Sequence, residues 1–487
     1  MLRRAALVVA LLLTAACGST VPRAARTAAG DGLSGRASLA TGATDELAGG
    51  ETAASSGVSG TSPSGASPGT GSARTGNPVT GRVASGVGAV VGARGGTVSI
   101  GIRYPNDSSG LITTTGFHGI NPGDSKAMAQ AVVDDINGRG GIAGRKIAPL
   151  YYPFDVTGST APGGGDSEQQ KACAAFTEDN HVFGVVSPIV SGNVLQQCLA
   201  KRGVVFADEN WNYFDGDIRT DNYWDPAYPD PMRSIPALVD RLSAESFFGP
   251  GSRIGAVYQD LPNRQTVLNK ALKPALAKHG LRLDGTVAWT AQNADALFAG
   301  VLQFKTAGIT HVFVLDPGGL ETFGWMAAAE SQNYRPKYAL DTRNYPVLQA
   351  GQSPAAQLAN ARGIGWIPSA DVGVQPAAEL TPADRRCLGI VAKANQDMSD
   401  PTNVRVALAY CDTLEFLKQA AGDANSVLSL LSIKTGGEGL GPRYTPTGTF
   451  SATFGPKRHD GASAARDLVF DTACTCFKYT GPVFSIG

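Results

Sequence analysis

The sequence has little charge and no excess of either sign. Its 487 residues include 41 Lys or Arg and 41 Asp or Glu, so the formal net charge is zero, and charged residues make up only 17% of the chain. A nucleic-acid-binding domain concentrates Lys and Arg on one face, and a basic membrane-surface segment does the same. We therefore expect no nucleic-acid partner and no polybasic membrane patch.

Long apolar runs are also missing, and the run at the start is short. Residues 5–13 are apolar and follow Arg3 and Arg4, but a transmembrane helix needs about 20 such residues, so this run predicts a signal peptide. Three small residues then lead directly to Cys17, an order typical of a bacterial lipobox, in which the thiol is acylated and the chain is cut. We predict a lipoprotein signal peptide over 1–17 that ends at lipidated Cys17. The alternative is an ordinary signal peptide beside an unrelated Cys.

The next segment lacks aromatic residues. Residues 18–95 contain no Phe, Trp or Tyr and consist largely of Ala, Gly, Ser, Thr and Pro. Such a segment cannot bury enough apolar surface to offset the entropy lost on ordering. We expect a disordered tether between the lipid and a folded part, which would be anchored to the outer face of the cell membrane without spanning it.

Cysteine is scarce, with seven residues, and His is scarcer, with five. Once Cys17 is set aside, six cysteines remain, an even number that favours disulfides in an exported chain. The simplest pairing is local: Cys173–Cys198, Cys387–Cys411 and Cys474–Cys476. The first would close a loop worth about 3–4 kcal/mol, whereas the last would close a very small ring. The His residues lie too far apart for zinc-ligand spacing, so no metal site is expected.

From residue 96 onward, short β-branched runs alternate with segments of helical periodicity, and the alternation restarts near residue 253. This order is typical of an α/β fold with parallel sheets, and a part of this length exceeds one core, so we predict two doubly wound lobes. Ligands bind such sheets at the carboxyl ends of the strands. The expected strands cover 97–103, 146–152, 181–186, 204–207, 253–258, 286–289, 311–315 and 338–340, with extended structure beyond 443. The expected helices cover 125–137, 167–178, 191–201, 265–279, 295–307, 321–330, 382–396 and 403–421.

Three stretches resemble a known family. They are residues 134–147 (DDINGRGGIAGRKI), 182–209 (VFGVVSPIVSGNVLQQCLAKRGVVFADE) and 404–421 (VRVALAYCDTLEFLKQAA). Each is similar to a segment of the branched-chain amino-acid-binding family, the solute-binding proteins of ABC importers with the type I periplasmic-binding fold. The match runs from about residue 96 to the end, and many members carry a disulfide where Cys173 and Cys198 fall. The resemblance implies no cofactor.

The resemblance implies two lobes joined by a three-stranded hinge that closes on a solute. Lobe one would comprise 96–243 with 368–437, and lobe two 244–367 with 438–487. It also implies a function without enzymatic activity: the protein would bind an amino acid or a related small polar molecule and deliver it to a membrane permease.

In lobe one, the carboxylate of an amino acid suits a helix N-terminus, where backbone N–H groups and the helix dipole favour an anion. Ser191 and Gly192 begin a predicted helix, and the family's serine-type contacts carry over to Ser191, whose alternative role is an N-cap. Asn210 and Trp211 follow the next strand, at a second contact point where the family has smaller hydroxylic residues. Phe117 resembles an aromatic pocket wall of the family, and its alternative role is ordinary loop packing.

In lobe two, Asp316 and Asp341 each follow a predicted strand, where an acid could meet an ammonium group. The family's acidic contact carries over best to Asp341. Several members have an aromatic ring where Asp316 stands, and this departure argues against a simple aliphatic amino acid. Helix caps or solvated acids are the alternatives for both residues.

Two other functions stay open. A sensor of the same fold would bind its ligand in the same pocket and signal to a membrane partner. A hydrolase is a weaker alternative, because the folded part shows no local Ser/His/Asp, H-E-x-x-H or paired-carboxylate pattern, although such sites can assemble in space. Residues 209–231 are rich in aromatic and acidic residues, which predicts a pocket larger and more polar than one for leucine.

Overall fold

The computed structural model describes most of the chain beyond residue 92. It covers residues 93–94, 96–106, 123–155, 164–188, 192–209, 221–290, 293, 295–316, 318–373, 377–423 and 427–487. Every described residue belongs to one compact unit, 82–487. The predicted signal peptide with Cys17, the tether up to residue 92 and four predicted ligand contacts (Phe117, Ser191, Asn210 and Trp211) lie outside the described residues.

The first sheet is built around β2, a strand with two buried faces. Its residues Val98, Ile100 and Ile102 are fully buried, and a Cβ added at Gly101 would lie 2.5 Å from the Phe176 ring, so only glycine allows this close approach. The parallel strands run in the order β3-β2-β4-β5-β6, and β1 pairs antiparallel with the start of β2. The strands are β1 (Ala93–Arg94), β2 (Thr97–Pro105), β3 (Lys146–Phe154), β4 (Gly184–Ser187), β5 (Val205–Asp208) and β6 (Tyr223–Trp224).

The second sheet is parallel apart from an antiparallel hairpin at one edge. Its order is β8-β7-β9-β10-β11-β12-β13, and β12 pairs with β11 from Arg362↔Val469 to Gly365↔Arg466. The extended structure predicted beyond residue 443 is present as this hairpin. The strands are β7 (Ile254–Gln259), β8 (Leu283–Trp289), β9 (His311–Leu315), β10 (Lys337–Asp341), β11 (Arg362–Gly365), β12 (Ala464–Asp471) and β13 (Cys476–Ser485).

Several helices begin at a polar side chain that accepts a hydrogen bond from the first turn. Asp124 caps α2, Thr381 caps α14 and Asp400 caps α15 in this way, which explains why these segments begin where they do. The longer helices are α2 (Ser125–Gly138), α4 (Gly164–Ala174), α5 (Asn193–Lys201), α6 (Pro231–Ala244), α9 (Asp295–Thr306), α10 (Leu320–Ser331), α14 (Pro382–Ala392), α15 (Pro401–Ala420) and α16 (Leu430–Leu440). The shorter helical segments are η2 (Ala175–Asp179), α7 (Pro262–Val267), η4 (Leu268–Leu272), α8 (Lys273–Lys278), η5 (Thr342–Asn344), α11 (Pro346–Gln352), α12 (Ala355–Leu358), α13 (Pro368–Asp371), η6 (Ala377–Glu379) and η7 (Gly441–Arg443).

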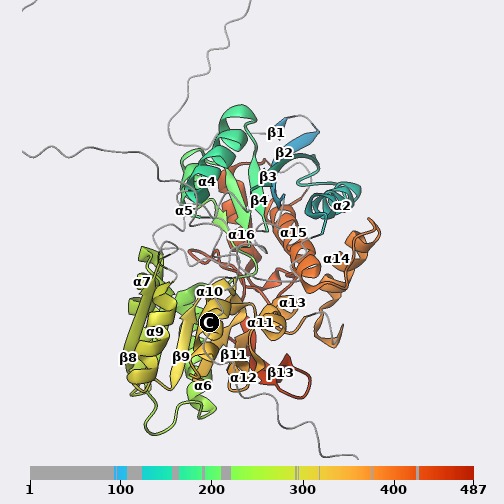
Figure 1. The fold of residues 1–487 in the computed structure, drawn as a ribbon. Coiled ribbons are helices and arrows are strands. Elements are labelled where there is room, and N and C mark those ends of the chain that lie inside the picture. Colours follow the sequence, from blue (N-terminus) through green and yellow to red (C-terminus); the bar gives the residue numbers. More distant parts are fainter. Residues whose placement is uncertain are drawn as a thin grey trace, which may run out of the picture. The chain divides into compact units, whose positions relative to one another are not determined.

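Each sheet has its own apolar core. Strands of the first sheet share a core with α2 and with α14, α15 and α16, which come late in the sequence but lie beside it (Figure 1). Helix α6 packs in the core of the second sheet through Ile235, Leu238 and Val239. Residues Tyr444 and Phe454 pack in the first core.

The chain passes between the two sheets three times: between β6 and α6, between β11 and α14, and between α16 and β12. The first and third crossings lie side by side, because Asp225 and Asp460 form a parallel β-bridge. Next to this bridge the His459 ring stacks on Trp224, with ring centroids 3.8 Å apart, and Arg233 of α6 forms an ion pair with Asp460. These crossings form the three-stranded hinge of the predicted fold class.

Three disulfides join neighbouring elements. Cys173–Cys198 links α4 to α5, Cys387–Cys411 links α14 to α15, and Cys474–Cys476 spans the turn between β12 and β13. The same three pairs were expected from their spacing in the sequence. Within the part of the chain that the structure describes, no helix combines the length and the apolar character needed to cross a membrane.

Candidate functional site

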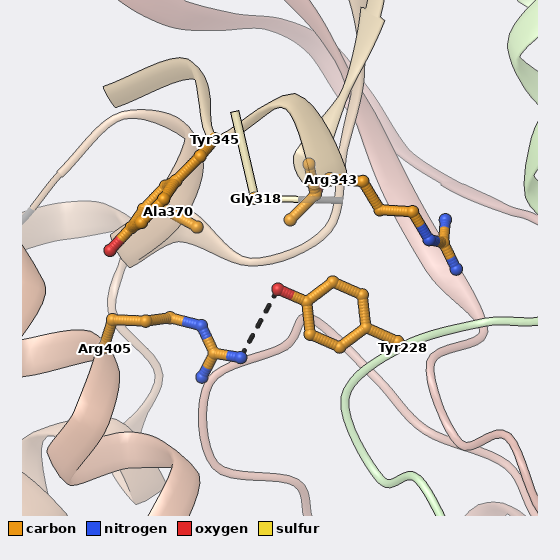
Figure 2. A pocket seen from close by; sticks show the side chains of 7 residues that line it. Tyr228, Gly318, Arg343, Tyr345, Ala370 and Arg405 are labelled. Carbon is orange, nitrogen blue, oxygen red and sulfur yellow. Dashed lines mark hydrogen bonds between the residues drawn. The ribbon is translucent and has the colours of Figure 1, made fainter. Parts of the chain in front are cut away.

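A small hollow lies where elements of the two cores meet, as Figure 2 shows. It is lined by Tyr228, Gly318, Thr342, Arg343, Tyr345, Ala370 and Arg405, and its space of about 180 Å³ between atoms is partly open to solvent and too narrow to hold a water molecule. Gly318 and Thr342 follow the carboxyl ends of β9 and β10, whereas Arg405 belongs to α15, which packs in the first core. Tyr228 lies on the first crossing, so the hollow joins both sheets and the hinge. This is the place where such a fold holds a ligand.

Arg405 is a buried cation on the first-core side of the hollow. One of its guanidinium nitrogens forms an ion pair with the buried Glu209, and another donates a hydrogen bond of 3.4 Å to the Tyr228 hydroxyl (Figure 2). Burial raises the pKa of Glu209 even though Arg405 opposes the shift. Burial alone would lower the pKa of Arg405, but the Glu209 carboxylate reverses this and raises it. Arg405 therefore stays charged in the interior.

A second buried guanidinium, that of Arg343, flanks the same tyrosine. Its nitrogen Nη1 donates to the Ser234 hydroxyl at 3.1 Å, and its central carbon lies 5.6 Å from the Tyr228 ring centre and 5.1 Å from that of Trp366. The Arg405 guanidinium lies at the same 5.6 Å from the Tyr228 ring. Cation–π contacts of this kind stabilise a charge away from water, so the Tyr228 ring helps to hold both cations.

The predicted acid Asp341 lies at the end of β10 and caps the turn that follows. Its Oδ1 accepts a hydrogen bond of 2.8 Å from the Arg343 amide, and its own amide donates to the Asn344 side chain at 2.8 Å. Its Oδ2 receives no hydrogen bond from any described residue and lies 3.6 Å from Arg343 Nη1. The capping role that the sequence left open is therefore present, and the buried Oδ2 forms an ion pair with Arg343.

The predicted acid Asp316 has a similar arrangement after β9. Its Oδ2 accepts hydrogen bonds of 2.7 Å from both the amide and the hydroxyl of Thr322, near the start of α10, whereas Oδ1 has no hydrogen-bond partner among the described residues. Asn344 Nδ2 donates to the same Thr322 hydroxyl at 2.9 Å. Thr322 and Asn344 therefore connect the two acids, which lie at the ends of adjacent parallel strands.

Burial shifts the protonation of both acids. It raises the pKa of Asp316 to about 6, against the opposing hydrogen bonds from Thr322. Burial also raises the pKa of Asp341, with Arg343 opposing. A cationic group placed next to either carboxylate would restore the charged form, which is the chemistry that an ammonium-binding site requires.

Asp371, in the second crossing, is a functional candidate that the sequence reasoning missed. Its Oδ2 accepts hydrogen bonds from the Thr342 hydroxyl (3.0 Å), the Ile367 amide (3.0 Å) and the Tyr479 hydroxyl (2.6 Å). Burial raises the pKa of Asp371 to about 7. Thr342 lines the hollow and Tyr479 belongs to β13, so the hydrogen bonds of Asp371 connect the wall of the hollow to β13.

The N-terminus of α5, predicted to hold a carboxylate, already has a protein partner. Gly192 is the residue before the helix, and a Cβ there would lie 2.5 Å from the Gln169 side chain, whose oxygen accepts a hydrogen bond of 3.1 Å from the Leu195 amide. Four ranges outside the described residues each come after a strand of the first sheet: 107–122, 156–163, 189–191 and 210–220. Three of them contain the other predicted first-lobe contacts, namely Phe117, Ser191, and Asn210 with Trp211.

Arg343, Arg405 and Tyr228 also escaped the sequence reasoning. Arg343 could have been found, because it comes two residues after a strand-end acid. Arg405 carries a weaker signal, a single charge inside the apolar helical segment VRVALAY. Among the described residues, no group of three or more His, Cys, Asp or Glu could hold a metal ion.

The family model described as periplasmic binding protein matches residues 109–466. This match covers most of the chain, so the protein belongs to that family, which confirms the resemblance in its sequence. No curated protein matches the chain.

Solved structures share the fold. A possible leucine/isoleucine/valine-binding protein from Rhodopirellula baltica has a TM-score of 0.59 at 13% identity, over 79% of this chain and 96% of that one. A branched-chain amino acid transporter substrate-binding protein from Streptococcus pneumoniae, in complex with isoleucine, gives 0.56 at 15%, over 80% and 99%. A fatty acid ABC transporter substrate-binding protein from Thermomonospora curvata gives 0.57 at 16%, over 82% and 95%. These likenesses confirm the type I periplasmic-binding fold.

Proposed function

We propose that the protein captures an amino acid or a related small polar solute between its two sheets and delivers it to the permease of an ABC importer. The observation that carries the proposal is the hollow of Figure 2, which Arg405 lines from the first-core side and Gly318 and Thr342 line from the second-sheet side. A solute held there would contact both halves, so its binding would favour the closed arrangement. Membership of the periplasmic binding family supports this function.

The surroundings of the hollow favour a polar solute over a long acyl chain. Arg343 and Arg405 line it, and the buried acids Asp316 and Asp341 lie at the adjacent strand ends. An alkyl chain packed against these charged groups would displace water from them and add no polar contact, which is costly. An amino acid instead carries an ammonium group that would meet a carboxylate at the strand ends. The isoleucine complex of the Streptococcus relative supports this class of solute.

The remaining contacts are assigned from the family pattern. Ser191 and Gly192, before α5, would bind the solute carboxylate through a hydroxyl and a backbone amide. Phe117, Asn210 and Trp211 would form the first-lobe wall of the pocket. Asn210 and Trp211 are bulkier and carry different polar groups from the small hydroxylic residues of the family at this point, which favours a solute larger and more polar than leucine.

The proposed location is extracytoplasmic. The signal peptide would direct export, the lipid on Cys17 would anchor the protein, and residues 18–95 would act as a tether. Three disulfides support an oxidising compartment. From the core assignments, lobe one would comprise 96–230 with 372–463, and lobe two 231–371 with 464–487.

A thermal-shift screen tests the proposal directly. The compact unit 82–487 would be heated with amino acids, amides, urea, short peptides, aromatic acids and fatty acids. A solute at 100 times its Kd stabilises the native state by about 2.7 kcal/mol, which is a shift of several degrees. We expect a shift confined to one class of amino acid or amide. A shift with fatty acids alone, or with no compound, would contradict the proposal. Loss of uptake of that solute after deletion of the gene would distinguish import from sensing.

A further inference from the structure

The third disulfide differs from the other two in its position. Cys476 is the first residue of β13 and pairs with Asp471, the last residue of β12, so Cys474–Cys476 lies in the hairpin turn. The preceding pair of the ladder, Phe470 with Phe477, is buried in the core of the second sheet. The turn is therefore a small polar loop on a firmly packed hairpin.

The third disulfide is also the accessible one. Cys474 is exposed and Cys476 is half-buried, whereas Cys173, Cys387 and Cys411 are at most 3% exposed. Cys198 is half-buried but packs against an apolar cluster. A thiolate must reach a disulfide sulfur to react with it. It reaches Cys387–Cys411 only after local opening of the fold and Cys173–Cys198 only past the half-buried Cys198, whereas the turn disulfide presents the exposed Cys474.

The third disulfide contributes little to stability through loop closure, and the residue inside its ring has a strained backbone conformation. The half-cystines of the third disulfide are 2 residues apart, against 25 and 24 for the others, so its loop-closure contribution is the smallest. The residue between them, Thr475, has φ +53°, a left-handed conformation that is unfavourable for a β-branched side chain. Opening the ring would let Thr475 leave this conformation.

From this contrast we infer that Cys474–Cys476 is a reversible thiol–disulfide exchange site for low-molecular-weight thiols, on a protein whose other disulfides are inert. A small thiolate attacks the more exposed Sγ of Cys474, the Sγ–Sγ bond breaks, and Cys476 leaves as a thiolate that takes a proton from water. A second small thiolate then attacks the small-thiol sulfur of the mixed disulfide. The products are the Cys474 and Cys476 thiols and one small-molecule disulfide, so two small thiols supply the two electrons.

Alkylation mapped by mass spectrometry tests the inference on the native protein. The protein would be treated with reduced glutathione, quenched with iodoacetamide at intervals and digested. We expect alkylation at Cys474 and Cys476 at least roughly 100-fold faster than at the other four cysteines, with the circular dichroism spectrum unchanged. Equal rates at all six cysteines, or alkylation of 474 and 476 only after the others, would overturn the inference.

Three variants sharpen the test. Thr475→Gly removes the penalty of the left-handed conformation and should slow reduction several-fold, while Thr472→Gly, in the same turn, should leave the rate unchanged. Cys476→Ser leaves Cys474 as a single thiol and should take up one glutathione from oxidised glutathione. A Cys476→Ser protein that stays unmodified would show that Cys474 is not accessible to small thiols, and would also overturn the inference.

Discussion

At the residue scale, the two carboxylate oxygens of Asp341 have different roles. Oδ1 caps η5, and Oδ2 forms a buried ion pair with Arg343. Asn at this position keeps a capping acceptor but loses the negative charge. Asp341→Asn should therefore weaken solute binding at least about tenfold and lower the unfolding free energy by about 1–3 kcal/mol, because the buried Arg343 loses its ion pair. Calorimetric titration and urea unfolding measure the two effects.

Asp240→Asn is the matched control for that substitution. Asp240 lies on α6, is exposed and pairs with Lys278, away from the hollow. Its replacement should leave the solute affinity at the wild-type value. If Asp341→Asn binds as tightly as the control, Asp341 has only a structural role.

Asp371 should give the protein a measurable pH dependence. Its pKa is about 7 in the folded state and near 3.8 in the unfolded chain, so the folded state holds the proton more tightly. This contribution to stability is complete below about pH 4 and is lost as the pH rises to about 7. At about 1.4 kcal/mol per unit, it amounts to at most about 4 kcal/mol.

The variant Asp371→Asn isolates this contribution, because its side chain is neutral at every pH. Between pH 4 and pH 8, the unfolding free energy of the wild type should fall relative to that of Asp371→Asn. Urea unfolding at several pH values measures the difference. Parallel curves for the two proteins would mean that Asp371 keeps an ordinary pKa.

The two strand-end acids of the second lobe were predictable as residues, because short apolar runs, HVFVL and YAL, locate the ends of β9 and β10. Their hydrogen bonds were not predictable. Whether Asp316 caps a helix depends on Thr322, and the link to Asp341 depends on Asn344 from another segment. Arg405 was missed for the same reason, since its partner Glu209 is far away in the sequence and the two meet only in the folded chain.

At the scale of elements, strand–helix alternation predicted most strands of both sheets, because β-branched runs and helical periodicity are local signals, but it missed β6 and β11. Two of the longer helices also went unpredicted. Helix α6 contains Pro236, which normally argues against a helix, and α16 contains the glycine-rich string KTGGEGL. In α16, Gly437 is needed for packing, since a Cβ there would lie 2.7 Å from the Trp224 ring. Tertiary contact overrides local propensity there.

The substitution Gly436→Ala should separate α16 from α15. A Cβ on Gly436 would lie 1.9 Å from the Ala420 carbonyl oxygen, so the helices must move apart. We expect a loss of about 1–3 kcal/mol in unfolding free energy, measured by urea unfolding.

Gly439→Ala, in the same helix, is the control. A Cβ there meets nothing within 4 Å, and alanine favours a helix by up to about 1 kcal/mol, so this variant should equal or exceed the wild type in stability. Equal effects of the two substitutions would show that α16 does not pack closely on α15.

At the scale of the whole molecule, Arg233 of α6 binds residues of the third crossing and of the segment after β13. It ion-pairs with Asp460 and donates to the carbonyls of Ala462 (3.0 Å) and Ile486 (3.3 Å). Arg233→Met should cost about 2–3 kcal/mol and lower the denaturant m-value, because the two cores then unfold less cooperatively. Arg335→Met removes an exposed ion pair with Glu330 and should leave both the stability and m close to the wild-type values. Equal m-values in both variants would contradict the coupling role of Arg233.

The pairing of β11 with β12 also determines when folding can end. The edge of strand β11 that faces away from β10 stays unpaired until residues 466–469 of β12 have been synthesised and pair with it. Until then it is an open edge, which is a template for aggregation. The first core likewise lacks α14, α15 and α16 until late in synthesis. A chain stalled or cut before residue 464 would therefore lack a finished sheet and be recognisable as incomplete by proteases and chaperones.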